Sequence, residues 1–135
     1  MVDISKALVD SNVVIDITGE DTVWRSWSVD ALESCETAFV NPLIFAELCY
    51  LKPSPTKVEK LLEGLGISYL EGLPKEALFL AAQAYKLYRS RGGTKMAPLP
   101  DFFIGAHAAV LGIPILTRDV TRYQTYFPTV TLISP

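Results

Sequence analysis

The sequence predicts an α/β fold, in which a mostly parallel five-stranded sheet lies between two layers of helices in a three-layer α/β/α sandwich. Short apolar runs bounded by polar or turn residues are typical of strands buried on both faces of a parallel sheet. Helix signals separate these runs, which indicates βαβ units with right-handed crossovers. The chain has 135 residues, the size of one domain, so we expect residues 1–135 to form a single domain.

Five segments are the candidate strands. The clearest are residues 6–10 and 113–117, because each is an apolar run that ends in polar residues. Residues 38–40, 67–70 and 130–133 are weaker candidates of similar length. We therefore expect a sheet of five short strands.

Helices are expected between these strands. Asn41 and Ser54 are capping residues, and each is followed by a proline at the first helical position, which predicts helices over about 42–51 and 55–65. Three more helices are predicted, from Thr22 to Leu32, from Pro74 to Gly92 and from Pro100 to Gly112. Paired glycines and three positive charges in residues 89–95 predict a flexible connection between the last two helices.

Composition excludes several classes of protein. The chain contains one histidine, so a histidine-rich zinc site and most histidine-based catalytic triads are hard to build. The longest apolar runs are far shorter than the ~18 residues that suggest a membrane span, and the first ten residues lack the apolar region of a secretory signal. Cys35 and Cys49 have no CxxC spacing, which predicts buried reduced thiols and a cytoplasmic protein. Half of the residues are hydrophobic, which predicts that a partner subunit covers part of the surface.

Charge is distributed unevenly along the chain. Residues 1–76 contain 13 acidic and six basic residues, whereas residues 77–122 contain six basic residues and only two acidic ones, Asp101 and Asp119. Counting by segment is more informative than the net charge of −3. These two acids stand in a basic part of the sequence, and they are candidate functional residues.

Four carboxylates are expected near one edge of the sheet. In open α/β sheets the binding crevice lies outside the carboxyl ends of the strands. Asp10 ends the first strand, Glu47 lies on the helix entered after residue 40, and Asp119 follows the strand at 113–117. Asp101 lies in the first turn of its helix and reaches the same edge if that helix begins beside the strand ends.

Each carboxylate has a structural alternative. Asp10 could cap the following helix, and Asp101 could simply complement a helix N-terminus. Glu47 stands in an otherwise apolar helical segment, so it either faces solvent on a thin polar stripe or shares a polar site with a cation. Four carboxylates at one crevice would repel one another unless a divalent cation neutralised them. Oxygen-only ligands favour Mg²⁺ or Mn²⁺, one or two ions, and such a site suits phosphodiester hydrolysis by water.

Four motifs in order resemble those of the PIN-domain nucleases, and in particular the VapC-like toxins of bacterial and archaeal toxin–antitoxin pairs. They are Leu8–Asp16, Asn41–Glu47, Pro100–Gly112 and Ile115–Asp119. Together they span nearly the whole chain, and their ordered combination is specific although each motif alone is weak.

The resemblance implies roles for six residues. Asp10, Glu47, Asp101 and Asp119 would be the catalytic, metal-binding acids, with Asn12 and Thr117 as polar support beside them. Members of the family cleave RNA, often as dimers, and a small antitoxin that fills the crevice holds them inactive. The resemblance therefore implies an RNA substrate, an antitoxin partner and a homodimer.

The third and fourth motifs each depart from the family pattern at one position. Gly105 stands where alanine is more usual, and Arg118 stands directly before the last acid. Arg118 could pair with Asp119 and weaken metal binding, or point outward and hold an RNA phosphate, and we favour the second.

Other polar residues have weaker signals. Arg89, Arg91 and Lys95 are candidate contacts to an RNA backbone, with a solvated loop as the alternative. Asp16 is interpreted as a solvated helix carboxylate outside the site, and His107 as a structural residue.

The leading hypothesis is thus a Mg²⁺- or Mn²⁺-dependent endoribonuclease that serves as a toxin. Three alternatives stay open: a PIN-domain RNA-processing nuclease outside a toxin system, a non-catalytic RNA- or protein-binding module, and a phosphatase that uses Asp10. Against the phosphatase, Asn12 stands where such enzymes would need a second aspartate.

Overall fold

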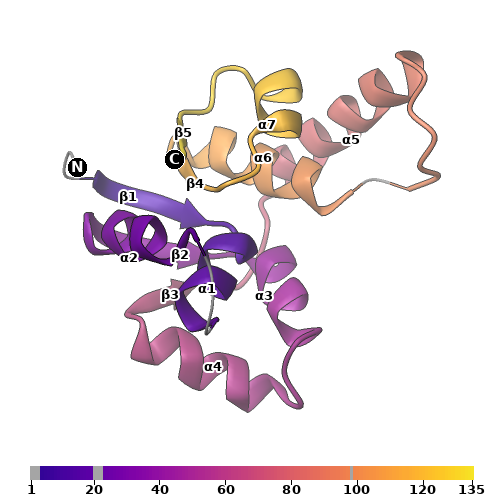
Figure 1. Ribbon diagram of the computed structural model, residues 1–135. Helices are drawn as coiled ribbons and strands as arrows, with labels where there is room; N and C mark the ends of the chain where they lie inside the picture. Colours follow the sequence, from indigo (N-terminus) through magenta and orange to yellow (C-terminus); the bar gives the residue numbers. More distant parts are fainter. Residues whose placement is uncertain (1–3, 20–22, 98) are drawn as a thin grey trace.

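The computed structural model describes residues 4–19, 23–97 and 99–135. Strands and helices alternate along the chain (Figure 1). The strands are β1 (Ile4–Val9), β2 (Cys35–Val40), β3 (Ile67–Tyr69), β4 (Ile115–Leu116) and β5 (Leu132–Ile133). The helices are α1 (Ser11–Thr18), α2 (Arg25–Glu33), α3 (Pro42–Cys49), α4 (Pro55–Gly64), α5 (Lys75–Ser90), α6 (Pro100–Leu111) and α7 (Thr121–Tyr126).

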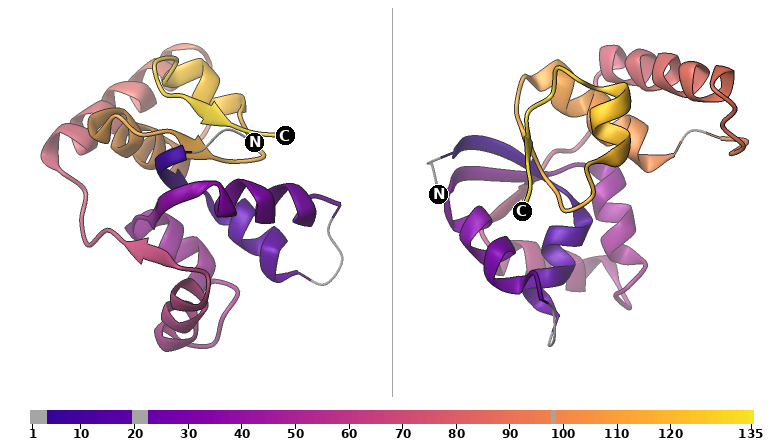
Figure 2. Two further views of the ribbon diagram at one scale, coloured as in Figure 1. Left: turned by 90° about the vertical axis from the view of Figure 1, so that its left-hand side faces the viewer. Right: turned by 45° about the horizontal axis from the view of Figure 1, so that its top comes forward.

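The sheet lies between two layers of helices, so the predicted three-layer α/β/α architecture is confirmed. Its order is β3-β2-β1-β4-β5, and every pair of neighbouring strands is parallel. Helices α1 to α4 gather on one side of β1, and α5 to α7 gather on the other, in both Figure 1 and Figure 2. Strand order reverses between β1 and β4, which is where α/β sheets form their binding crevice.

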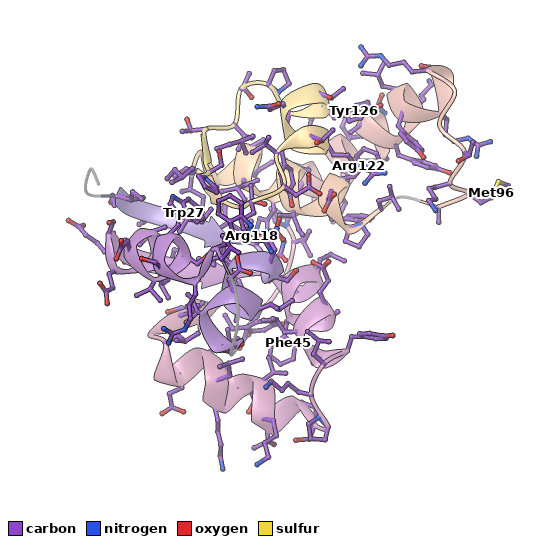
Figure 3. The ribbon with its side chains drawn as sticks, in the orientation of Figure 1. Trp27, Phe45, Met96, Arg118, Arg122 and Tyr126 are labelled. Atoms are coloured by element: carbon purple, nitrogen blue, oxygen red, sulfur yellow. The ribbon has the colours of Figure 1, made fainter. Side chains whose placement is uncertain are left out.

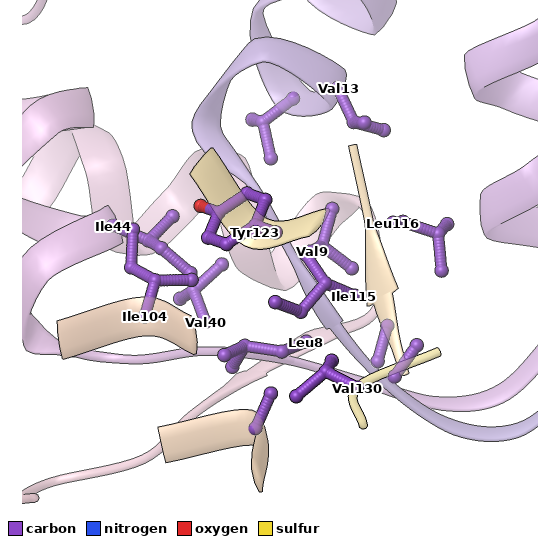
Figure 4. Packing of buried hydrophobic residues seen from close by; sticks show 14 of the residues in the cluster. Leu8, Val9, Val13, Val40, Ile44, Ile104, Ile115, Leu116, Tyr123 and Val130 are labelled. Atoms are coloured by element: carbon purple, nitrogen blue, oxygen red, sulfur yellow. The ribbon is translucent and has the colours of Figure 1, made fainter. Parts of the chain in front are cut away.

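The core is built on the central strands. Leu8 and Val9 of β1 and both residues of β4 are fully buried, as the apolar runs predict for a sheet covered on both faces (Figure 4). Helix α6 covers one face with the buried side chains of Phe102 and Ile104. This burial places the carboxyl ends of β1 and β4 side by side on a rigid support.

The two predicted helix caps are confirmed. The side chain of Asn41 accepts a hydrogen bond from the backbone N–H of Ile44 at 2.9 Å, and that of Ser54 accepts one from Lys57 at 3.3 Å. Each cap satisfies an N–H group that the first turn of the helix leaves without a helical partner.

Several boundaries differ from the predicted ones. Strand β2 begins at Cys35 rather than at residue 38, because its register with β1 starts at the Ile4–Cys35 pair. Strand β4 contains only Ile115 and Leu116. Helix α2 begins at Arg25, and the predicted start at Thr22 lies outside the described residues. Helix α7 was not predicted, because its six residues show no apolar periodicity.

Gly105 on α6 is explained by a contact with the residue after α7. A Cβ atom added at Gly105 would lie 2.3 Å from the ring of Phe127. The third motif has glycine instead of alanine because the Phe127 ring packs directly on the helix backbone there.

Two further findings bear on the class of protein. Cys35 and Cys49 are free thiols, and both are partly buried. No helix in the described part of the chain is long and apolar enough to cross a membrane.

Candidate functional site

Asp10 lies where the sheet order reverses. Its backbone N–H donates to the carbonyl of Leu116 at 2.9 Å, which places it beside Thr117. Its side chain is 5% exposed, and one carboxylate oxygen, Oδ1, accepts a hydrogen bond from the N–H of Ser11 at the start of α1. The residue therefore caps α1 and also presents a carboxylate at the predicted crevice.

Thr117 connects three of the polar residues at this edge. Its hydroxyl donates to Oδ2 of Asp10 at 3.0 Å. The Thr117 hydroxyl oxygen itself accepts hydrogen bonds from the side-chain amide of Asn12 and from the backbone N–H of Asp119, both at 3.1 Å. Thr117 thus holds the loop of Asp119 against β1 and α1.

Tyr123 on α7 is a buried member of the site that the sequence did not reveal. Its hydroxyl lies 2.9 Å from Oδ2 of Asp10 and 3.4 Å from Oδ1 of Asp101. Burial and the neighbouring carboxylates raise the pKa of Tyr123, so the hydroxyl stays protonated and donates. It brings Asp101, at the start of α6, towards Asp10.

Asp101 has a second partner on α7. The guanidinium of Arg122 lies 3.6 Å from Oδ2 of Asp101. Burial raises the pKa of Asp101, Arg122 lowers it, and the charge of Asp119 raises it again. Asp119 itself is exposed at the rim. Its effect on Asp101 shows that the two carboxylates share one electrostatic environment.

Glu47 lies in the second turn of α3 and reaches the same environment. Within the part of the chain that the structure describes, its buried Oε1 atom has no hydrogen-bond partner. Burial raises the pKa of Glu47 to about 7, and the charges of Asp10 and Asp101 add to the rise. The predicted alternative of a solvated polar stripe is therefore wrong: the carboxyl group is a partly buried member of the acidic cluster.

The four predicted carboxylates share one edge but do not form a closed metal cage. Among residues 4–19, 23–97 and 99–135, no three His, Cys, Asp or Glu side chains could hold a metal ion as they stand. Tyr123 lies between Asp10 and Asp101, and Arg122 pairs with Asp101. The donor set nevertheless fits a divalent cation, because its ligands are all oxygen atoms and the Glu47 Oε1 atom lacks a partner.

The family profile of the PIN domain matches residues 7–127 of the chain. The chain belongs to the PIN domain family. No curated protein matches it by sequence.

Solved structures with the same fold include VapBC-1 from nontypeable Haemophilus influenzae, with a TM-score of 0.70 and 14% identity over 96% of this chain and 97% of that chain. A toxin–antitoxin complex from Klebsiella pneumoniae has a TM-score of 0.69 and 18% identity, with the same coverage. FitAcB from Neisseria gonorrhoeae has a TM-score of 0.66 and 22% identity, again over 96% and 97%.

Asp16 and Arg118 correct two interpretations of the sequence. Asp16 of this PIN domain is 2% exposed rather than solvated. Its carboxylate accepts two hydrogen bonds from Arg118, one of them 3.0 Å long from Nη2, and another from the hydroxyl of Ser28 at 3.2 Å. Arg118 (labelled in Figure 3) therefore points neither at Asp119 nor freely outward, but ties the loop after β4 to α1, and Asp16 in turn contacts Ser28 of α2.

The other basic candidates lie at the far end of α5. The side chain of Arg89 donates to the carbonyl of Lys95 at 3.0 Å, so it ties the following loop to the helix. Arg91 stands over the ring of Tyr126 on α7, 5.7 Å from its centroid. His107 of the PIN domain is buried and lies 3.2 Å from the side-chain amide of Asn41, in the structural role that we predicted.

Proposed function

We propose that this PIN domain is a Mg²⁺- or Mn²⁺-dependent endoribonuclease that acts as the toxin of a toxin–antitoxin pair. The observation that carries the proposal is Glu47. A buried carboxylate oxygen without a partner is costly, and two further carboxylates raise the cost. A cation at this edge would reduce the free-energy cost of burying Glu47. The reaction type that we propose follows from the membership of the chain in the PIN domain family.

Asp10, Glu47, Asp101 and Asp119 would hold one or two ions. When bound, such an ion supplies an acidified water and positive charge beside a phosphodiester. Within the chain, Tyr123 holds Asp10 and keeps its proton, because its pKa is raised. The Oδ2 atom of Asp10 already accepts two hydrogen bonds, whereas Oδ1 accepts one and has a lone pair left for a ligand.

The same hydrogen bonds favour this proposal over an aspartate-dependent phosphatase. A phosphate acceptor needs a free carboxylate oxygen that can move onto phosphorus. Hydrogen bonds to each oxygen of Asp10 fix the direction of its carboxylate, and the side chain is almost fully buried, so it has little freedom to move onto phosphorus. Asp10 is suited to a fixed ligand role.

The proposed partner is a small antitoxin, because one of the structural neighbours is described as a toxin–antitoxin complex. We also propose a homodimer, since Leu78, Phe79 and Leu80 of α5 are exposed and Phe79 is 63% accessible. The free thiols are consistent with action in the cytoplasm.

Purified protein incubated with single-stranded and structured RNAs tests the activity. Cleavage should require Mn²⁺ or Mg²⁺, stop in EDTA, and be lost in Asp101→Asn. The matched control is Asp30→Asn, which removes an exposed carboxylate from α2. Cleavage that persists in EDTA or in Asp101→Asn would overturn the metal site, and RNA binding without cleavage would indicate a non-catalytic module.

Expression in bacteria tests the toxin role separately. The wild-type chain should arrest growth, Asp101→Asn should not, and the product of a neighbouring short reading frame should restore growth when expressed together with it. Metal-dependent RNA cleavage without growth arrest would instead support an RNA-processing nuclease.

A further inference from the structure

An open pocket of about 340 Å³ adjoins the carboxylates. It is lined by Tyr88 of α5, by Asp119, and by Thr121, Arg122, Thr125 and Tyr126 of α7. Its volume lies within the range of small-molecule sites. Because Asp119 belongs both to this pocket and to the carboxylate edge, a group seated in the pocket lies directly beside the proposed reaction centre.

Helix α7 forms one wall of the pocket through its sequence spacing. Residues four apart share a face of a helix. Tyr123 and Phe127 are buried on the core side, whereas Arg122 and Tyr126 lie between α7 and α5 (Figure 3). The pocket wall therefore carries an aromatic ring and a guanidinium one helical turn apart.

The two tyrosine rings of the pocket are held firmly. The ring of Tyr126 packs edge-on against Phe102, with centroids 5.4 Å apart, and against Tyr88 at 6.2 Å. A Cβ atom added at Gly93 would lie 2.3 Å from the Tyr88 ring, so the loop backbone packs directly on it. The N–H of Lys95 donates to the Tyr88 hydroxyl at 3.3 Å. Rigid rings bind a flat ligand at a low cost in conformational entropy.

Positive charge stands at both rings. The guanidinium carbon of Arg122 lies 6.0 Å from the centroid of Tyr88, and that of Arg91 lies 5.7 Å from the centroid of Tyr126. Aromatic faces stack on nucleobases, and arginine binds phosphate and stacks on bases as well. The combination fits one nucleotide unit, with the base against the tyrosines and the phosphate near Arg122, the arginine that lines the pocket.

We propose that the Tyr88–Tyr126 pocket binds an unpaired nucleobase next to the phosphodiester that is cut. The inference rests on the proposed nuclease function and adds a binding site for the base of the nucleotide beside the bond that is cut.

Binding of mononucleotides tests the pocket without any cleavage. The four nucleoside 5′-monophosphates and ribose 5-phosphate are titrated into the wild-type protein with Mn²⁺ and followed by tyrosine fluorescence. The nucleotides should bind about tenfold more tightly than ribose 5-phosphate, because only they carry a base. Tyr126→Leu should remove this difference, and Tyr126→Phe, which keeps the ring, should retain it.

Abasic substrates test the position of the base. In a short RNA with one cleavage site, an abasic nucleotide directly beside that site should lower kcat/KM about tenfold for the wild type. Tyr126→Leu should be equally slow on both RNAs, and Tyr126→Phe should behave as the wild type. A thermal melt establishes that Tyr126→Leu is folded, and if it is not, the wild-type comparisons decide alone.

The outcomes separate this inference from the proposed function. If nucleotides and ribose 5-phosphate bind equally, or if an abasic neighbour does not change the rate of RNA cleavage, the pocket does not bind a base. Neither result would contradict the proposed nuclease activity. Base-dependent binding in a protein that cuts no RNA supports the pocket and overturns the nuclease.

Discussion

Replacing Glu47 by glutamine should stabilise the protein in the absence of divalent ions. Glutamine keeps the shape of the side chain but cannot carry the charge that is buried beside Asp10 and Asp101. The pKa of Glu47 is raised from 4.5 to about 7, a difference equivalent to about 3 kcal/mol. Since the group is only partly buried, solvent reduces this, and we expect a gain of about 1–3 kcal/mol in the free energy of unfolding above pH 7.

The pH dependence of this gain follows from the direction of the shift. Between pH 4.5 and 7 the folded protein keeps a proton on Glu47 that the unfolded chain has released. The wild type therefore loses stability as the pH rises through this window. The advantage of Glu47→Gln should be close to zero at pH 4.5, grow up to about pH 7 and stay constant above it.

Urea denaturation in EDTA, at intervals from pH 4 to pH 8.5, measures the effect. Glu36→Gln is the matched control, because Glu36 is exposed on β2, and it should change stability by less than about 0.5 kcal/mol. Adding Mn²⁺ should stabilise the wild type and have a smaller effect on Glu47→Gln. A variant that is destabilised to the same extent at every pH would refute the reasoning, because Glu47 would then act through packing alone.

Three further variants test the surroundings of the site. Tyr123→Phe should lower the free energy of unfolding at pH 8 by about 1.5–3 kcal/mol, measured by urea denaturation, because the buried Asp10 loses a charge-assisted hydrogen bond; an unchanged midpoint would contradict this. Arg118→Gln should lower kcat for RNA cleavage without changing how RNA affinity depends on salt, because the Arg118 guanidinium contacts Asp16 rather than RNA. A slope of log affinity against log salt concentration that is smaller by about one would instead identify a phosphate contact. Gly105→Ala should lower the free energy of unfolding by about 1–3 kcal/mol, seen as a lower melting temperature, because the added methyl group meets the ring of Phe127. A melting temperature equal to that of the wild type would show that this ring can move aside.

The parts of the fold that could be predicted depend on local signals. The caps at Asn41 and Ser54 and the apolar runs of β1 and β4 are readable within a few residues of sequence. The position of Asp10 at the crevice followed from a general property of α/β sheets. Local pattern and topology together were enough to place Asp10 at the carboxyl end of the central strands.

The parts that could not be predicted are contacts between distant segments. Arg118 and Asp16 are 102 positions apart in sequence, and neither carries a local sign of the other. Tyr123 lies on a helix of six residues with mixed polarity, and its hydroxyl reaches Asp10 across 113 positions. Such contacts depend on how helices pack over the sheet, so only the structure shows that Asp16 is buried and that Tyr123 belongs to the site.

Helix α7 has a buried side that packs on the core and an exposed side that lines the pocket, and the residues of the two sides can change independently. The buried side chains of Tyr123 on α7 and of Phe127 directly after it are fixed by the carboxylates and by Gly105. Its outer positions, Thr121 and Thr125, are exposed at the pocket. Related chains could therefore acquire different nucleotide preferences by substitution at the outer positions, with little loss of stability. The same two threonines are the natural starting points for redirecting the protein to a chosen RNA.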